Sequence, residues 1–165
     1  MFTLRCTQKL LRRLKRPAKR ETGSPTTILG DWYVNLLYTR PHQLVLCVNE
    51  RSLLSVILMA RDLDSLIPRF QRGVFELLMA IGIPSHAVQA EGREMKEVAF
   101  GKTASRSVLG SMKEITFALR LELDRSPLSS PLELSLFLST VLMGGIGMRC
   151  PREVARELLR GGSRE

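Results

Sequence analysis

The chain has 165 residues, the size of one domain, and its apolar and charged fractions of 44% and 25% are those of an ordinary folded protein. These values exclude a disordered tail, a collagen-like chain, a disulfide-rich scaffold and a membrane bundle. The formal net charge of +9 points to an anionic partner. We expect a single domain over residues 1–165, with a mobile loop at 18–27 and a disordered tail at 160–165.

The positive charge is concentrated at the start of the chain. The first 20 residues contain eight cations and no acid, whereas the remaining 145 contain 17 cations and 16 acids. These eight cations are Arg5, Lys9, Arg12, Arg13, Lys15, Arg16, Lys19 and Arg20. Such a local cluster attracts anions more strongly than the same charge spread over the whole surface.

The first third of the chain is predicted to form strands around one short helix. Alternation over residues 2–6 predicts a strand, and leucines on one face of residues 7–16 predict a basic amphipathic helix. Three apolar runs follow at residues 32–38, 44–48 and 53–59, joined by short turns. Connections this short cannot cross over between parallel strands, so these runs predict an antiparallel meander.

From residue 62 onwards the apolar period changes from two to about 3.6. Helices are expected at 62–81, at 85–91, from Ser105 or Ser107 to about Leu123, at 132–143 and at 152–159, with a strand within 94–103. The predicted fold class is α+β, with an N-terminal antiparallel meander, helices packed on it and a mainly helical C-terminal half. The residues predicted to be buried are Leu46, Val48, Ile57, Leu66, Phe70, Leu77, Ile115 and Leu119.

The number and spacing of the cysteines match neither a disulfide framework nor a metal site. Cys6, Cys47 and Cys150 are odd in number and far apart, so we expect three free thiols in a cytoplasmic protein. With only two histidines in addition, no metal site and no cofactor are predicted. No apolar run reaches the length that a bilayer requires, so we expect no membrane association.

Cations and hydroxyls also cluster at residues 102–107, where a helix is expected to begin. This segment is either an anion site or an ordinary capped helix start with a solvated arginine. Together with the basic helix, it gives the candidate residues for binding an anion or nucleic acid: Arg5, Lys9, Arg12, Arg13, Lys15, Arg16, Lys102 and Arg106. Four of them, Arg5, Lys9, Lys102 and Arg106, would form one basic pocket if the two segments meet at one sheet edge.

Several short residue blocks, taken together, give the chain a recognisable sequence pattern. They are Arg5-Cys6-Thr7 with Lys9-Leu10-Leu11, Gly30-Asp31-Trp32 with Asn35-Leu36, Val48-Asn49-Glu50, Lys102-Thr103, Arg106-Ser107-Val108 and Gly110-Ser111-Met112. Through these blocks the chain resembles a bacterial family, domain of unknown function 6933. The resemblance implies a bacterial cytosolic protein without an established activity. The resemblance implies Asn-Asp after Ser111-Met112, but this chain has Lys113-Glu114, so it departs from the family pattern at this polar pair.

We expect a non-enzymatic binding module that contacts nucleic acid or an acidic protein through its basic N-terminal helix. Because Phe2 is the only ring in the first 31 residues, base stacking is not expected there, and contacts to phosphates should dominate. Two alternatives stay open. One is a phosphate- or nucleotide-handling enzyme centred on Arg5, Lys102, Arg106 and Ser111. The other is a subunit of a plasmid, mobile-element or defence complex, or a homo-oligomer, that uses residues 132–148 as its interface. No catalytic residue is predicted.

Overall fold

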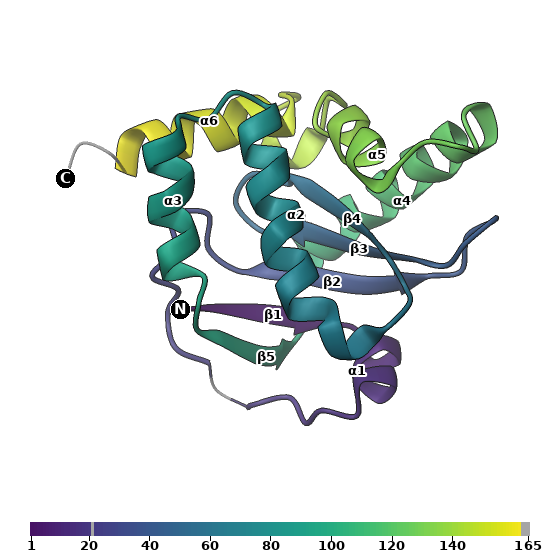
Figure 1. The fold of residues 1–165 in the computed structure, drawn as a ribbon, viewed down its shortest axis with the longest axis horizontal. Helices are drawn as coiled ribbons and strands as arrows, with labels where there is room; N and C mark the ends of the chain where they lie inside the picture. Colours follow the sequence, from purple (N-terminus) through teal and green to yellow (C-terminus); the bar gives the residue numbers. More distant parts are fainter. Residues whose placement is uncertain (21, 163–165) are drawn as a thin grey trace.

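The computed structural model describes residues 1–20 and 22–162, and five strands form one mixed sheet within it (Figure 1). The strands are β1 (Phe2–Cys6), β2 (Trp32–Leu37), β3 (Leu44–Asn49), β4 (Ser55–Met59) and β5 (Val98–Lys102). The helices are α1 (Gln8–Leu14), α2 (Leu66–Ala80), α3 (Ser85–Glu94), α4 (Arg106–Arg125), α5 (Pro131–Leu138) and α6 (Pro151–Gly161). This arrangement confirms the predicted α+β class.

The sheet combines the predicted meander with two parallel strands. Its order is β4-β3-β2-β1-β5, and the pairs β2–β3 and β3–β4 are antiparallel as expected. The first strand of the chain lies inside the sheet, where Leu4 pairs with Trp32 on one side and with Phe100 on the other, both in parallel. The carboxyl ends of β1, β2 and β5 therefore point to the same end of the sheet, where the segments after β1 and β5 meet.

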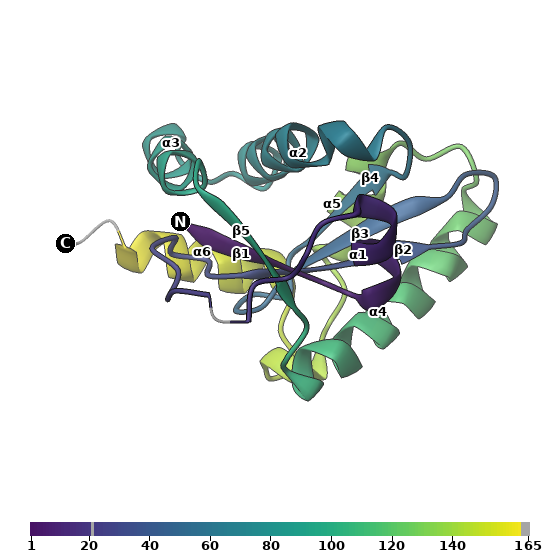
Figure 2. The same ribbon diagram turned by 90° about the horizontal axis from the view of Figure 1, so that it is seen from below.

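Helices cover both faces of the sheet (Figure 2). On one face, α2 and α3 pack on side chains such as Phe2, Trp32 and Val56. On the other face, α4 packs Val108, Ile115 and Leu119 against residues of β2 and β3. All eight residues that the sequence predicts to be buried belong to these two cores or their strands: Leu46, Val48, Ile57, Leu66, Phe70, Leu77, Ile115 and Leu119.

Two close contacts position the helices on β4. A Cβ at Gly73 of α2 would lie 2.8 Å from the Cγ1 atom of Val56, so only glycine lets the helix approach the strand this closely. At the outer edge of the sheet, the Ser135 hydroxyl of α5 accepts a hydrogen bond of 2.9 Å from the Ile57 N–H. Thus α5 covers the edge of β4, which would otherwise offer unpaired groups to another strand.

Buried polar groups hold the segment that precedes β2. The Asn49 side chain is fully buried, donates to the carbonyl oxygens of Leu29 and Asp31, and accepts from the Ser52 N–H. The Glu91 carboxylate of α3 accepts from the Leu29 N–H at 3.1 Å and also from the N–H of Ile28. Burial raises the pKa of Glu91 above its ordinary value, against the smaller opposing effect of these hydrogen bonds.

The structure changes some predicted boundaries. The helix expected at 132–143 ends at Leu138, and a turn containing Gly144 follows, because the apolar run has no helical period that would mark its end. Part of the expected tail at 160–165 is helical, since α6 extends to Gly161, and 163–165 lie outside the described residues. The segment 18–27, except for Glu21, which is also outside, is irregular and hydrogen bonds to Phe100 and Met1. Within the described part of the chain, no helix is long and apolar enough to span a membrane.

The three cysteines are free and differ in accessibility, which gives a chemical test of the fold. Burial raises the pKa of Cys6 to about 12 and that of Cys47 further, so both are protonated thiols shielded from solvent at neutral pH. Cys150 is only partly buried. We expect an alkylating reagent to modify Cys150 first in the native protein and all three cysteines after denaturation, as read by mass spectrometry. Modification of Cys47 as fast as Cys150 would contradict this core.

Candidate functional site: a basic groove

Arg5, one of the predicted anion-binding residues, is engaged within the protein. Its Nε donates to the Asp31 carboxylate at 3.1 Å, and a terminal nitrogen donates to the Lys102 carbonyl oxygen at 3.2 Å. The other oxygen of Asp31 accepts from the Thr3 N–H at 2.9 Å. Arg5 thus links β1 to the residue before β2 and to the end of β5. These contacts give the Arg5 side chain a structural role that requires no ligand.

A groove opens beside this network, at the carboxyl end of β2, between α1 and α4. It has a volume of about 650 Å³ and is lined by Thr7, Lys9, Asn35, Leu37, Arg106, Leu109, Gly110, Met112, Lys113, Thr116 and Arg120. We call it the basic groove. Gly110 contributes no side chain, and a Cβ there would meet nothing within 4 Å, so the α4 wall is open at its middle. Ends of parallel strands are a common place for ligands to bind.

Four cations and no acid line the basic groove: Lys9, Arg106, Lys113 and Arg120. The three on α4 recur every seven residues, two helical turns apart, and therefore lie on one face. Among the described residues, none of the four forms an ion pair with a carboxylate. Because no carboxylate in the described part of the chain pairs with them directly, these like charges favour an anion in the groove.

The start of α4 is fixed by capping, which sets the position of Arg106. The Ser105 hydroxyl accepts a hydrogen bond of 3.2 Å from the Val108 N–H, as the sequence predicts for one of its two candidate caps. The Ser105 N–H in turn donates to the Tyr33 hydroxyl of β2 at 3.0 Å. Ser105 therefore caps α4, while Lys102 ends β5, and the exposed Arg106 side chain lines the basic groove.

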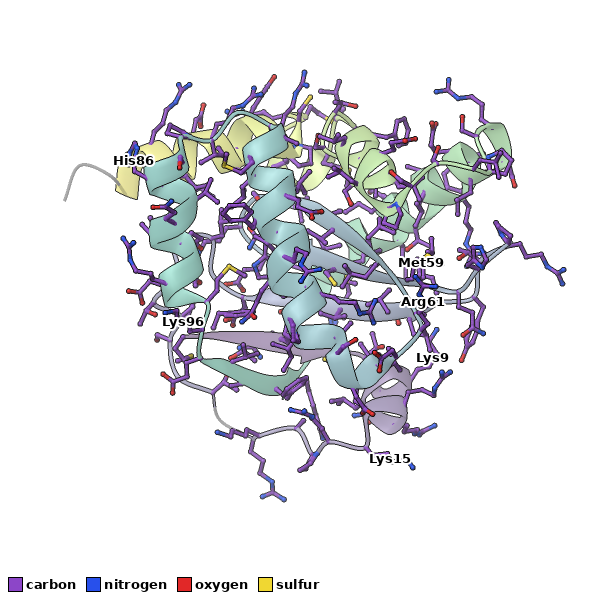
Figure 3. All side chains as sticks on the ribbon, in the orientation of Figure 1. Lys9, Lys15, Met59, Arg61, His86 and Lys96 are labelled. Carbon is purple, nitrogen blue, oxygen red and sulfur yellow. The ribbon has the colours of Figure 1, made fainter. Side chains whose placement is uncertain are left out.

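A second basic surface lies on the other side of α1. A hollow of about 300 Å³ is lined by Gln8, Leu11, Arg12, Lys15, Arg16, Pro17, Ala18 and Lys102. Arg16 also lies over the Phe100 ring, at 4.9 Å from its centroid. Figure 3 shows Lys15 at the lower edge of the molecule, pointing away from the sheet, and Lys9 nearer to the strands. We call this surface the α1 patch.

The structure separates the one basic pocket expected from Arg5, Lys9, Lys102 and Arg106. Only Lys9 and Arg106 share the basic groove, Lys102 belongs to the α1 patch, and Arg5 is engaged with Asp31. Arg13 is exposed on α1 but lines neither hollow. Sequence reasoning missed Lys113 and Arg120, although their spacing of seven residues from Arg106 was a usable signal.

A comparison against protein families confirms the resemblance carried by the residue blocks. The model of domain of unknown function DUF6933 matches residues 3–154. The chain belongs to this family. No curated protein matches the chain. Among the described residues, no group of three or more histidine, cysteine or acidic side chains could hold a metal ion. The basic groove and the α1 patch are the candidate functional surfaces of this DUF6933 chain.

Proposed function

We infer that the protein binds the phosphate backbone of nucleic acid along the basic groove and the α1 patch. The observation that carries this proposal is the convergence of Lys9, Arg106, Lys113 and Arg120 on one groove whose lining has no acid. The hollow on the other side of α1 also lacks an acid. A protein surface carries charges of both signs, whereas a nucleic-acid backbone is a uniform polyanion. Two neighbouring surfaces whose charged lining residues are all cations are complementary to a nucleic-acid backbone.

The salt dependence of binding tests this proposal. Each cation that neutralises a phosphate contributes about 0.9 to the slope of log affinity against log salt on duplex DNA and about 0.7 on a single strand. Replacing Lys9, Arg106, Lys113 and Arg120 with glutamine should therefore reduce the slope by roughly 3 and weaken binding at low salt. Fluorescence anisotropy of a labelled oligonucleotide at several salt concentrations measures both quantities. A variant lacking the charges of Arg12, Arg13, Lys15 and Arg16 should show a reduction of the same kind.

A matched control removes the same number of charges elsewhere. Arg61, Arg72, Arg93 and Arg160 are exposed and line neither the groove nor the α1 patch. Their replacement with glutamine should leave the slope nearly unchanged, and thermal unfolding should be similar for all three variants because the substituted side chains are at the surface. If the control weakens binding as much as the groove variant, only net charge matters and the groove has no special role.

A small phosphorylated ligand is the second candidate. Leu37, Leu109 and Met112 give the groove an apolar part, and its volume of about 650 Å³ lies in the range of small-molecule sites. Inorganic phosphate and a mononucleotide therefore belong in the same titration. If the mononucleotide binds and the oligonucleotide has no measurable affinity even at low salt, the nucleic-acid proposal is wrong. Binding of a small phosphorylated ligand is then the function of the groove.

A further inference from the structure

Two exposed aromatic rings are neighbours of residues that line the basic groove. Tyr38 follows the groove residue Leu37 directly and is 55% exposed, and the Lys9 ammonium lies 4.8 Å from the centroid of its ring. On α4, Phe117 is 65% exposed. It stands between the cations Lys113 and Arg120 on α4, four residues after the first and three before the second. Residues with this spacing share a helix face, so the ring lies on the same side of α4 as Lys113 and Arg120.

Exposure of these rings is unusual within this chain. Phe2, Trp32, Tyr33, Phe70 and Phe100 are buried. Of the described aromatic residues, only Tyr38, Phe75 and Phe117 expose about half of the side chain or more, and Phe75 lies on α2, on the opposite face of the sheet. Two of these three rings are thus neighbours of residues of the basic groove, whose four cations form no ion pair with a carboxylate among the described residues. Neither ring contributes to a core, so packing does not account for them.

We propose that the ligand of the basic groove is a single-stranded nucleic acid whose bases stack on Tyr38 and Phe117 while its phosphates contact the groove cations. This inference rests on the function proposed above and names its ligand. A positive groove that follows the backbone, with aromatic rings on which bases stack, is the usual construction of a surface that binds single strands. A duplex has the same backbone charge, but its bases are stacked on one another and are not available to a surface ring. The groove should therefore prefer the single strand.

The first measurement compares three ligands of equal length. They are an oligodeoxythymidine of about 12 nucleotides, an abasic deoxyribose-phosphate chain with the same number of phosphates, and a duplex. We expect the oligodeoxythymidine to bind most tightly. Replacing Phe117 or Tyr38 with alanine should weaken its binding roughly 5- to 150-fold and leave the salt slope unchanged, because stacking releases no counterions.

The controls separate ring from charge and from folding. Phe75→Ala removes a ring that is 47% exposed, on the other face of the sheet, and should leave affinity unchanged. Tyr38→Phe keeps the ring and should retain most of the affinity. The abasic chain should bind the wild type and the Phe117→Ala variant equally, since it offers no base to stack. A thermal unfolding curve for each variant shows that the exposed substitutions leave the fold intact.

Two other outcomes would contradict the proposal. If the abasic chain and the duplex bind as tightly as the oligodeoxythymidine, and Phe117→Ala changes nothing, then stacking is wrong while backbone binding stands. If no nucleic acid binds at low salt, or if polyglutamate binds more tightly than any of them, the proposed function itself is wrong and this inference falls with it.

Discussion

Asn49→Ala should reduce the free energy of unfolding by about 3–5 kcal/mol, because the Asn49 side chain serves five hydrogen bonds and is fully buried. Its amide donates to the carbonyl oxygens of Leu29 and Asp31 at 2.7 and 3.3 Å. Its oxygen accepts from the N–H groups of Arg51 and Ser52 and from the Ser52 hydroxyl. Alanine would leave several of these groups buried without a partner, and each such group costs about 1–3 kcal/mol. Urea unfolding followed by circular dichroism measures the loss.

Two comparisons test this explanation. Asn35→Ala removes an amide that is only partly buried and has one hydrogen bond, with Thr7, so it should cost less than about 1 kcal/mol. Asn49→Asp keeps the shape but places a second oxygen against two carbonyl oxygens, so it should also destabilise the protein. That loss should shrink as the pH falls, since a protonated carboxyl can donate one hydrogen bond. A cost for Asn49→Ala no larger than that for Asn35→Ala would show that the network contributes little.

Phe70→Ala should cost about 3–5 kcal/mol through the cavity it leaves in the core under α2. Phe70 is 1% exposed. Its ring centroid lies 5.2 Å from that of Trp32, in an edge-on arrangement, and 5.9 Å from that of Phe2. Because Trp32 is the sole tryptophan, its fluorescence reports both unfolding and the changed contact. Phe75→Ala on the same helix removes a ring that is 47% exposed and should cost much less. Equal costs for the two substitutions would mean that the α2 stripe is not a core contact.

The sequence was most informative where its apolar period was strong. The stripe through Leu66, Phe70 and Leu77 predicted α2, and the short turns between apolar runs predicted the meander. It was least informative about strand order. Alternation in Phe2–Cys6 identifies a strand with one polar face, but nothing local says that Asp31 and Thr22 will satisfy Arg5 on that face. The pairing of β1 with β5 is a property of the assembled sheet.

The site shows the same division between local and assembled features. Counting charges located α1, yet Lys9 meets Arg106, Lys113 and Arg120 only because α4 returns beside the end of β2. The aromatic rings were missed for a related reason. Tyr38 and Phe117 are far from the basic segment in sequence. Tyr38 contacts Lys9 only in the folded chain, and Phe117 lies on the side of α4 that carries Lys113 and Arg120. A pattern in a short stretch of sequence cannot show which distant residues the fold brings together.

The position of β1 inside the sheet has a consequence for how the chain folds during synthesis. Strand β1 leaves the ribosome well before its second neighbour, β5 (Val98–Lys102), because three other strands and three helices lie between them in the chain. Until then one edge of β1 is open to pairing with any other strand. The contact also has a large sequence separation, which slows folding because a long loop must close before the pairing forms. A nascent chain that stops before β5 would therefore expose an aggregation-prone edge beside a strongly cationic helix.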